Sequence, residues 1–306
     1  MIRFVVRRLL ASIVVVFVVA SASFLLLHAA PGGPFDTAER RSAVVQRAME
    51  DRYGLNDSLG AQYARELAHL ARGDLGRSIK RDLSVNDMIA RSAPVSALVG
   101  ALGLLAAIGL GLVMGVIAAW RRNSRTDYAL MGLALVGISI PSFVLGPLLI
   151  AELSLRLGWL PPARVDGPAG YVLPAITLGM LYLGTIARLT RGGMIEALGQ
   201  DYVRTARAKG LPERTVVWKH ALRLGVQPVV TYLGPATAAL ISGSFVVEKI
   251  FQIPGLGAAF VDSITEHDYP VLTGVFVFYA VLLVGLNLVV DLAYGLLDPR
   301  VREGRA

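Results

Sequence analysis

Six long stretches without charged side chains dominate this sequence. Each is close to the roughly 20 apolar residues that an α-helix needs to cross the hydrocarbon core of a bilayer. Charged residues make up only 17% of the 306 residues, whereas about 25% is usual in soluble domains. The mean hydropathy of +0.60 agrees with this. The sequence therefore predicts an all-α integral membrane protein with six spans, at residues 9–27, 95–119, 128–151, 171–187, 225–247 and 271–290.

Proline and glycine are frequent within these stretches. Proline breaks survive in a helix bundle because neighbouring helices satisfy the freed backbone groups. Small residues allow helices to approach closely, so we interpret both as packing features. The prolines are Pro141, Pro147, Pro174 and Pro235, and the second stretch carries Gly100, Gly103, Gly109, Gly111 and Gly115.

Arginine and lysine are concentrated in alternate loops, and such loops face the cytoplasm. Both termini are therefore expected to be cytoplasmic. The same distribution explains the net charge of +8 and argues against a nucleic-acid partner. The basic residues on this side are Arg3, Arg7, Arg8, Arg121, Arg122, Arg125, Arg191, Arg204, Arg207, Lys209, Arg214, Lys219, Arg223, Arg300, Arg302 and Arg305; the short loops opposite carry Arg156, Arg164 and Lys249.

The first stretch superficially matches a cleavable signal peptide, with basic residues, an apolar run and then Ala20-Ser21-Ala22. The apolar run continues through residues 24–27, however, beyond the 7–15 residues or so of a signal-peptide core. We expect it to be retained as a span.

Four segments are predicted on this basis: an N-terminal span at 1–30, an external helical insertion at 31–94, a five-helix core at 95–297 and a cytoplasmic tail at 298–306. The insertion mixes acids and bases and shows helical periodicity around Val44, Val45, Ala48, Met49 and Tyr53. It could be a solvated cap or a docking surface for an external partner, and the sequence does not separate the two.

The loop between the fourth and fifth spans, residues 191–228, is the most informative segment. Residues 194–209 are predicted to form a helix with Ile195, Leu198, Tyr202, Val203 and Ala206 on one face. Gly210 is expected just past its end in a left-handed conformation. Pro212 then occupies the first position of a second helix, whose apolar stripe comprises Val216, Val217 and Leu222.

A short cytoplasmic helix–Gly–helix element could seat its apolar stripe in a groove of a partner protein. A DNA-binding helix–turn–helix is a weaker alternative, because the element is tethered between two spans. An amphipathic helix lying on the lipid headgroups remains open on periodicity alone.

Twelve residues of this loop carry a resemblance to a known family. The run from Asp201 to Pro212, DYVRTARAKGLP, resembles the EAA loop of binding-protein-dependent ABC importer permeases, specifically the oligopeptide/dipeptide permease B subunit family. The resemblance extends along the chain through Arg7-Arg8-Leu9, residues 30–35 (APGGPF), residues 140–143 (IPSF), residues 253–257 (IPGLG) and residues 298–300 (DPR).

The resemblance implies a type I ABC importer permease fold that imports short peptides. It also implies a second homologous permease subunit, two ATP-binding cassette subunits and an extracytoplasmic substrate-binding protein as partners, in a bacterial inner membrane. One departure is Arg223, which stands where the general pattern has proline. The implied ATPase-coupling residues are Tyr202, Arg204, Thr205, Ala206, Lys209, Gly210, Leu211, Pro212 and Leu222.

The external loop at 248–270 is a candidate outer gate and binding-protein contact. Its run Pro254-Gly255-Leu256-Gly257 is expected not to continue a helix, and its flanks Phe251, Ile253 and Phe260 are apolar. We interpret it as a loop folded back over the mouth of the pathway, with a plain connecting loop as the alternative.

The chain carries no motif for chemistry of its own. A phosphate-binding G-x-x-x-x-G-K-[ST] run is missing from the sequence, so ATP hydrolysis is assigned to a partner subunit. We expect no enzyme activity, no metal site and no cofactor. The remaining alternatives are another cargo, such as nickel complexes or haem, and an ATP-independent channel or secondary transporter.

Polar groups near the spans are few. Asn287 and Asp291 share a helix face near the inner end of the last span, and a hydrogen bond or cap is as good an interpretation as a functional site. Glu152 and Arg156 are spaced for a local i,i+4 ion pair.

Overall fold

The computed structural model describes residues 2–29, 54, 56–241 and 245–297, without the side chains of 2–5, 238, 241 and 290–297. The predicted periodicity at 44–53, the tail at 298–306 and the side chain of Asp291 lie outside this part. Within the described residues the regular structure is helical, apart from one isolated β-bridge between Arg77 and Ser84. The chain divides into two compact units, one of residues 1–94 with 255–306 and one of residues 95–254.

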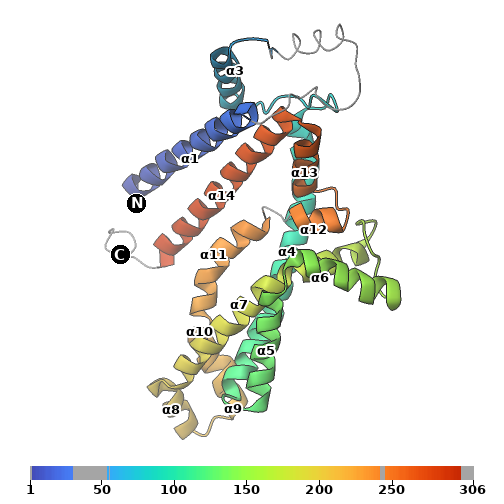
Figure 1. The fold of residues 1–306 in the computed structure, drawn as a ribbon. Helices are drawn as coiled ribbons and strands as arrows, with labels where there is room; N and C mark the ends of the chain where they lie inside the picture. The colour runs from blue at the N-terminus through green and yellow to red at the C-terminus, as the bar shows by residue number, and fades with distance from the viewer. Residues whose placement is uncertain (1, 30–53, 55, 242–244, 298–306) are drawn as a thin grey trace. The chain divides into compact units, whose positions relative to one another are not determined.

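The first unit is built on two long helices that pack along each other, α1 (Ile2–Ala29) and α14 (Tyr269–Leu297) (Figure 1). Helix α3 (Leu59–Ala71) begins after Ser58, whose side chain accepts a hydrogen bond from the Ala61 amide. Tyr63 anchors α3 on α1, because its hydroxyl lies 2.6 Å from Ser21 Oγ and its ring lies 5.2 Å from that of Phe24.

The core of this unit joins helix α13 (Leu256–Glu266) to its neighbours. Leu256 is buried with Val85 and Ile89 from the first turns of α4 (Val85–Trp120) and with Val271 and Val275 of α14. The start of α13 is therefore held by apolar contacts.

The second unit is arranged around α7 (Val172–Leu198), which packs against α5, α6, α10 and α11 (Figure 1). Three apolar clusters lie along the unit, and each contains buried side chains from a different part of α7. The other helices are α4 from Val95 onward, α5 (Arg125–Ser139), α6 (Ser142–Leu149), α8 (Asp201–Ala208), α9 (Glu213–Thr215), α10 (Leu222–Gly225), α11 (Gln227–Ile241) and α12 (Phe245–Ile250), with π-helical η1 (Ile150–Arg156) and η3 (Val216–Ala221) and the 3₁₀ turn η2 (Pro168–Tyr171).

The predicted close helix contact is confirmed for α4 and α7. A Cβ atom at Gly115 would lie 2.6 Å from the Ala187 carbonyl oxygen, and one at Gly103 would lie 3.0 Å from that of Ala175. Gly109 has open space around it. The glycines that face α7 therefore set its distance from α4, as small residues do between membrane helices.

Four of the predicted spans coincide with helices long and apolar enough to cross a membrane, at Val6–Ala29, Val85–Trp120, Pro168–Leu198 and Tyr269–Val289. The second runs through Pro94 and begins ten residues before the predicted start. The fifth predicted span, 225–247, contains only the 15-residue α11 before residues that are not described. The count of six therefore stays a prediction.

The third predicted span is not one straight helix. Helices α5 and α6 with η1 are bent by 106°. The bend falls at Ile140, whose backbone is extended, a conformation that the following Pro141 favours by disfavouring the helical one. The predicted pair of Glu152 and Arg156 is confirmed, with Nη1 and Oε2 3.0 Å apart.

Candidate functional site

The candidate coupling loop does not begin as predicted. In place of one helix over 194–209, α7 ends at Leu198 and α8 begins at Asp201. The Gly199 amide donates to the Glu196 carbonyl and the Gln200 amide to the Ala197 carbonyl, and Gln200 is extended. In a straight helix at about 100° per residue, Val203 would lie opposite Met194. The break lets both side chains enter one core.

The apolar stripe of the second helix and the apolar face of α8 are both packed into a core of this chain. Val203 and Ala206 of α8 and Val216 and Val217 of η3 are buried in a cluster with Met194, Ala197, Val116, Ala119 and Ala221, and Leu222 packs against it. The prediction that this stripe is free to seat in a partner's groove is therefore wrong. Burial fixes the loop to the ends of α4 and α7 as a rigid body.

What the loop exposes is the opposite face of α8 and the turn after it. Tyr202 is 37% exposed, and Arg204 is 75% exposed, with its Nη1 3.3 Å from Asp201 Oδ1. Among the nine predicted coupling residues, Ala206 is buried and Leu222 is half-buried. The exposed ones are Tyr202, Arg204, Thr205, Lys209, Gly210, Leu211 and Pro212.

Gly210 ends α8 in the predicted left-handed conformation, with φ +74°. Its amide donates to the Arg207 carbonyl at 2.9 Å, and the Leu211 amide donates to the Ala206 carbonyl at 3.3 Å. This pair of bonds is the Schellman motif, which favours glycine at this position. Pro212 lies one residue before α9 and not inside it, so its predicted position is wrong by one residue.

An ion pair closes the turn. Arg207 donates to Glu213 through Nε at 3.1 Å and Nη2 at 2.6 Å. The hydrogen bonds from Arg207 lower the pKa of the Glu213 carboxyl, and the same bonds raise the pKa of Arg207. Both side chains are about two-fifths exposed, so solvent screens the pair and its main effect is to orient α9 on α8.

Two close contacts at glycines join the loop to the helices on either side. At Gly193 of α7, a Cβ atom would overlap the Gly225 carbonyl oxygen of α10. At Gly225, a Cβ atom would lie 2.5 Å from Met194 Sδ. The chain that enters the loop and the chain that leaves it thus touch backbone to backbone, and η3 and α10 lead on into α11.

A buried ion pair, missed by the sequence reasoning, ties α5 to α7. Asp127 is 1% exposed and Arg191 is 28% exposed. Arg191 donates to the carboxylate through Nε at 2.6 Å and Nη2 at 2.7 Å, and the Asn123 amide also donates to it at 3.0 Å. The [ST]-x-x-[DE] capping pattern from Ser124 to Asp127 was the available signal, but it does not identify Arg191 as the partner.

The candidate outer-gate residues are largely buried. Phe251 lies in a cluster of the second unit with Val99 and Leu173, and Leu256 lies in the core of the first unit. As predicted, the run 254–257 does not continue α12. Its last two residues, Leu256 and Gly257, begin the next helix, α13. Of the five candidates Phe251, Pro254, Gly255, Leu256 and Gly257, Pro254 is exposed and the other four are buried.

Comparison with known proteins gives the family. Residues 111–303 match the family described as binding-protein-dependent transport system inner membrane component, and residues 1–97 match its N-terminal counterpart. The chain belongs to this permease family. It is 46% identical to the dipeptide transport system permease protein DppB of Bacillus subtilis (strain 168) over 303 residues, covering 99% of this chain and 98% of that protein.

Other relatives of this permease are also similar over their full length. The oligopeptide transport system permease protein OppB of Salmonella typhimurium is 41% identical over 305 residues, which cover 99% of this chain and all of that one. The glutathione transport system permease protein GsiC of Escherichia coli O6:H1 is 38% identical over 304 residues, 99% of each chain. The permease is thus a multi-pass component of a bacterial inner membrane.

Proposed function

We propose that this permease forms part of the pathway by which an ATP-driven importer moves short peptides across the inner membrane. The observation that carries the proposal is similarity along 99% of the chain to permeases named for dipeptides, oligopeptides and glutathione, since glutathione is itself a tripeptide. Its partners are a second homologous permease subunit, two ATP-binding cassette subunits and an extracytoplasmic substrate-binding protein, and ATP is hydrolysed by the cassette subunits.

In this proposal the chain crosses the membrane six times with both termini in the cytoplasm. Residues 31–94 form the external insertion, 95–297 the five-helix core and 298–306 the cytoplasmic tail. The basic loops support this orientation, because arginine and lysine are retained on the cytoplasmic side. Two of the six spans are not identified by helix length alone. The bent pair of α5 and α6 supplies the third span, and α11 supplies the fifth.

The loop at 191–228 is the proposed ATPase contact, through its exposed face from Tyr202 to Pro212. Two features support this role. The loop is rigid, because Val203, Ala206, Val216 and Val217 are buried. It is also joined directly to α7 and, through η3 and α10, to α11, so a displacement of α8 would be transmitted to both helices.

Transport by the complete system tests the proposed function. The permease, its second permease subunit and the two ATPase subunits are reconstituted in proteoliposomes, and uptake of a labelled tripeptide is measured. Uptake is expected to require both enclosed ATP and the binding protein. Equal uptake without ATP would contradict the proposal and favour a channel or secondary transporter.

Replacing Gly210 by valine tests the site within the same system. A non-glycine residue in the left-handed region costs about 1–2 kcal/mol, which corresponds to about a 5–30-fold shift in an equilibrium. We expect ATPase co-purification and tripeptide uptake to fall together by about tenfold, with normal membrane insertion. Gly192→Val is the matched control, since Gly192 has no positive φ and open space around it. Unchanged co-purification and uptake in Gly210→Val would instead favour a helix that lies on the lipid headgroups.

A further inference from the structure

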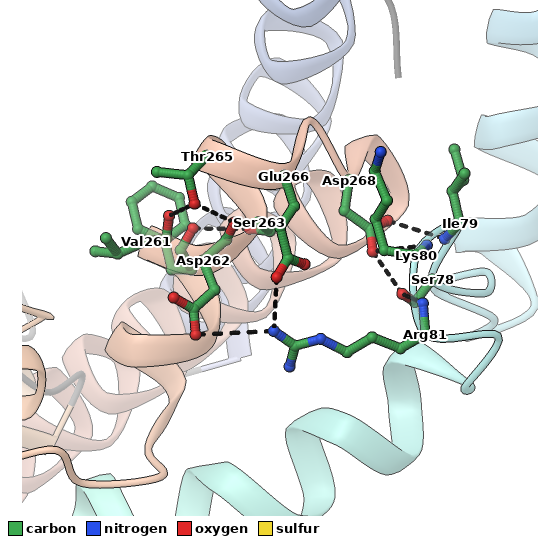
Figure 2. Close-up of polar contacts among 11 residues, drawn as sticks. Ser78, Ile79, Lys80, Arg81, Val261, Asp262, Ser263, Thr265, Glu266 and Asp268 are labelled. Carbon is green, nitrogen blue, oxygen red and sulfur yellow. Dashed lines mark hydrogen bonds and ion pairs between the residues drawn. The ribbon is translucent and has the colours of Figure 1, made fainter. Parts of the chain in front are cut away.

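The segment that leads into α4 forms a turn that lies against the junction of α13 and α14 (Figure 2). Arg77 and Ser84 make the β-bridge, and the Val85 amide donates to the Gly76 carbonyl at 3.0 Å. We call residues 73–84 the pre-α4 hairpin. It contacts a part of the chain that is distant in sequence, since Ser78 and Asp268 are 190 residues apart.

Asp268 is the centre of this contact. It precedes α14, is 1% exposed and accepts hydrogen bonds from Ser78 Oγ at 2.5 Å, the Ile79 amide at 3.1 Å and the Lys80 amide at 3.4 Å (Figure 2). A buried carboxylate is costly unless donors replace its water. Three donors from one turn of the hairpin do so here, so the burial of the Asp268 carboxylate depends on the position of the hairpin.

The hairpin turn is itself organised to present these donors. Ser78 is fully buried, and its Oγ accepts from the Arg81 amide at 2.9 Å while donating to Asp268. The backbone on the other side is fixed by the left-handed turn at His267, with φ +54°, between α13 and α14.

A second contact on the surface is weaker. Arg81 Nη2 lies 3.4 Å from Glu266 and 3.7 Å from Asp262, both on α13 (Figure 2). All three side chains are more than a third exposed, and exposed pairs contribute little. The attachment of α13 to the hairpin therefore depends chiefly on Asp268.

We propose that Asp268 is a positioning residue for the outer gate: its bonds to Ser78, Ile79 and Lys80 hold α13, and so Leu256 and Gly257, against the pre-α4 hairpin during transport. The inference rests on the proposed function as an importer and on the interpretation of residues 248–270 as a candidate outer gate. The contact ties both ends of α13, because Leu256 at its start is buried against Val85 and Ile89, which follow the hairpin directly. Movement of the hairpin and movement of α13 are then one movement.

The test uses Asp268→Asn in the complete transporter. The asparagine side chain keeps the shape but turns one acceptor into a donor that faces the hairpin's own donors, and a buried donor left without an acceptor is destabilising. The first readout is the position of α13. The chain contains no cysteine, so the buried Ser263 of α13 can be replaced by cysteine and its labelling by a water-soluble maleimide timed. Asp268→Asn is expected to speed labelling about tenfold.

The second readout is tripeptide uptake per inserted permease, expected to fall about tenfold with ATPase co-purification unchanged. Asp262→Asn, on the exposed side of α13, is the matched control and should alter both readouts less than about twofold. Faster labelling with normal uptake, slower uptake with normal labelling, or no change in either would each overturn the inference. Labelling does not depend on the cargo, so a wild-type transporter that takes up no tripeptide would count against the proposed function alone.

Discussion

Replacing Asp127 by alanine is expected to destabilise the permease by about 3 kcal/mol, because it leaves the guanidinium of Arg191 without its carboxylate between α5 and α7. Breaking a buried ion pair costs about 3–5 kcal/mol, and the lower value applies here because Arg191 retains partial exposure. The measurement is the denaturation midpoint of the purified transporter in detergent, together with the amount of permease that co-purifies with the ATPase subunits.

A double variant separates loss of the pair from loss of one partner. Arg191→Met alone should also destabilise, because within the described residues it leaves the buried carboxylate with the Asn123 amide as its remaining donor. Asp127→Leu with Arg191→Met should recover most of the loss, since a hydrophobic pair of similar volume can replace a buried ion pair at little cost. An Asp127→Ala variant as stable as Asp166→Ala, a change at an exposed aspartate, would contradict this account of the pair.

Alanine at Gly193 and alanine at Gly192 are expected to have opposite effects. A Cβ atom at Gly193 would overlap the Gly225 carbonyl oxygen, which is backbone and cannot rotate away. Overpacking of this kind costs about 1–3 kcal/mol. The same change at Gly192 adds a side chain in open space within α7, where alanine is favoured over glycine by about 1 kcal/mol.

The consequence for coupling follows from where Gly193 lies. Separation of α7 from α10 would loosen the loop that both helices support, so ATPase co-purification and uptake should fall in Gly193→Ala and persist in Gly192→Ala. Denaturation midpoints of the two variants, compared with that of the wild type, show whether each substitution stabilises or destabilises the permease. Two variants of equal stability would show that the close approach of α7 and α10 does not hold the loop.

Local features of this permease could be predicted from sequence. The spans at 9–27, 95–119, 171–187 and 271–290 each coincide with one apolar helix, because an apolar run of that length has few alternatives. Gly210 was placed in a left-handed conformation because glycine adopts it without steric cost. The pair of Glu152 and Arg156 needed only the helical repeat.

Features that depend on distant parts of the chain could not be predicted. The break at Gly199 and Gln200 arises because Met194 and Val203 share a core with Val116 and Val216, and neither the helical period nor a propensity contains that information. The same holds for the burial of the loop's apolar stripe. Asp127 and Arg191 are 64 residues apart, and in the sequence Arg191 indicates only the orientation of the chain in the membrane.

Crosslinking from two adjacent residues is the most direct test of our proposal that the exposed face of α8 contacts the ATPase. The chain has no cysteine, so a single cysteine is placed at Tyr202, which is exposed, or at Val203, which is buried. Each is treated with a short photoactivatable maleimide in the assembled transporter. We predict that the cysteine at 202 crosslinks to the ATPase subunit and that the one at 203 does not. A transporter that remains active with the cysteine at 202 but crosslinks there only to lipid would contradict it.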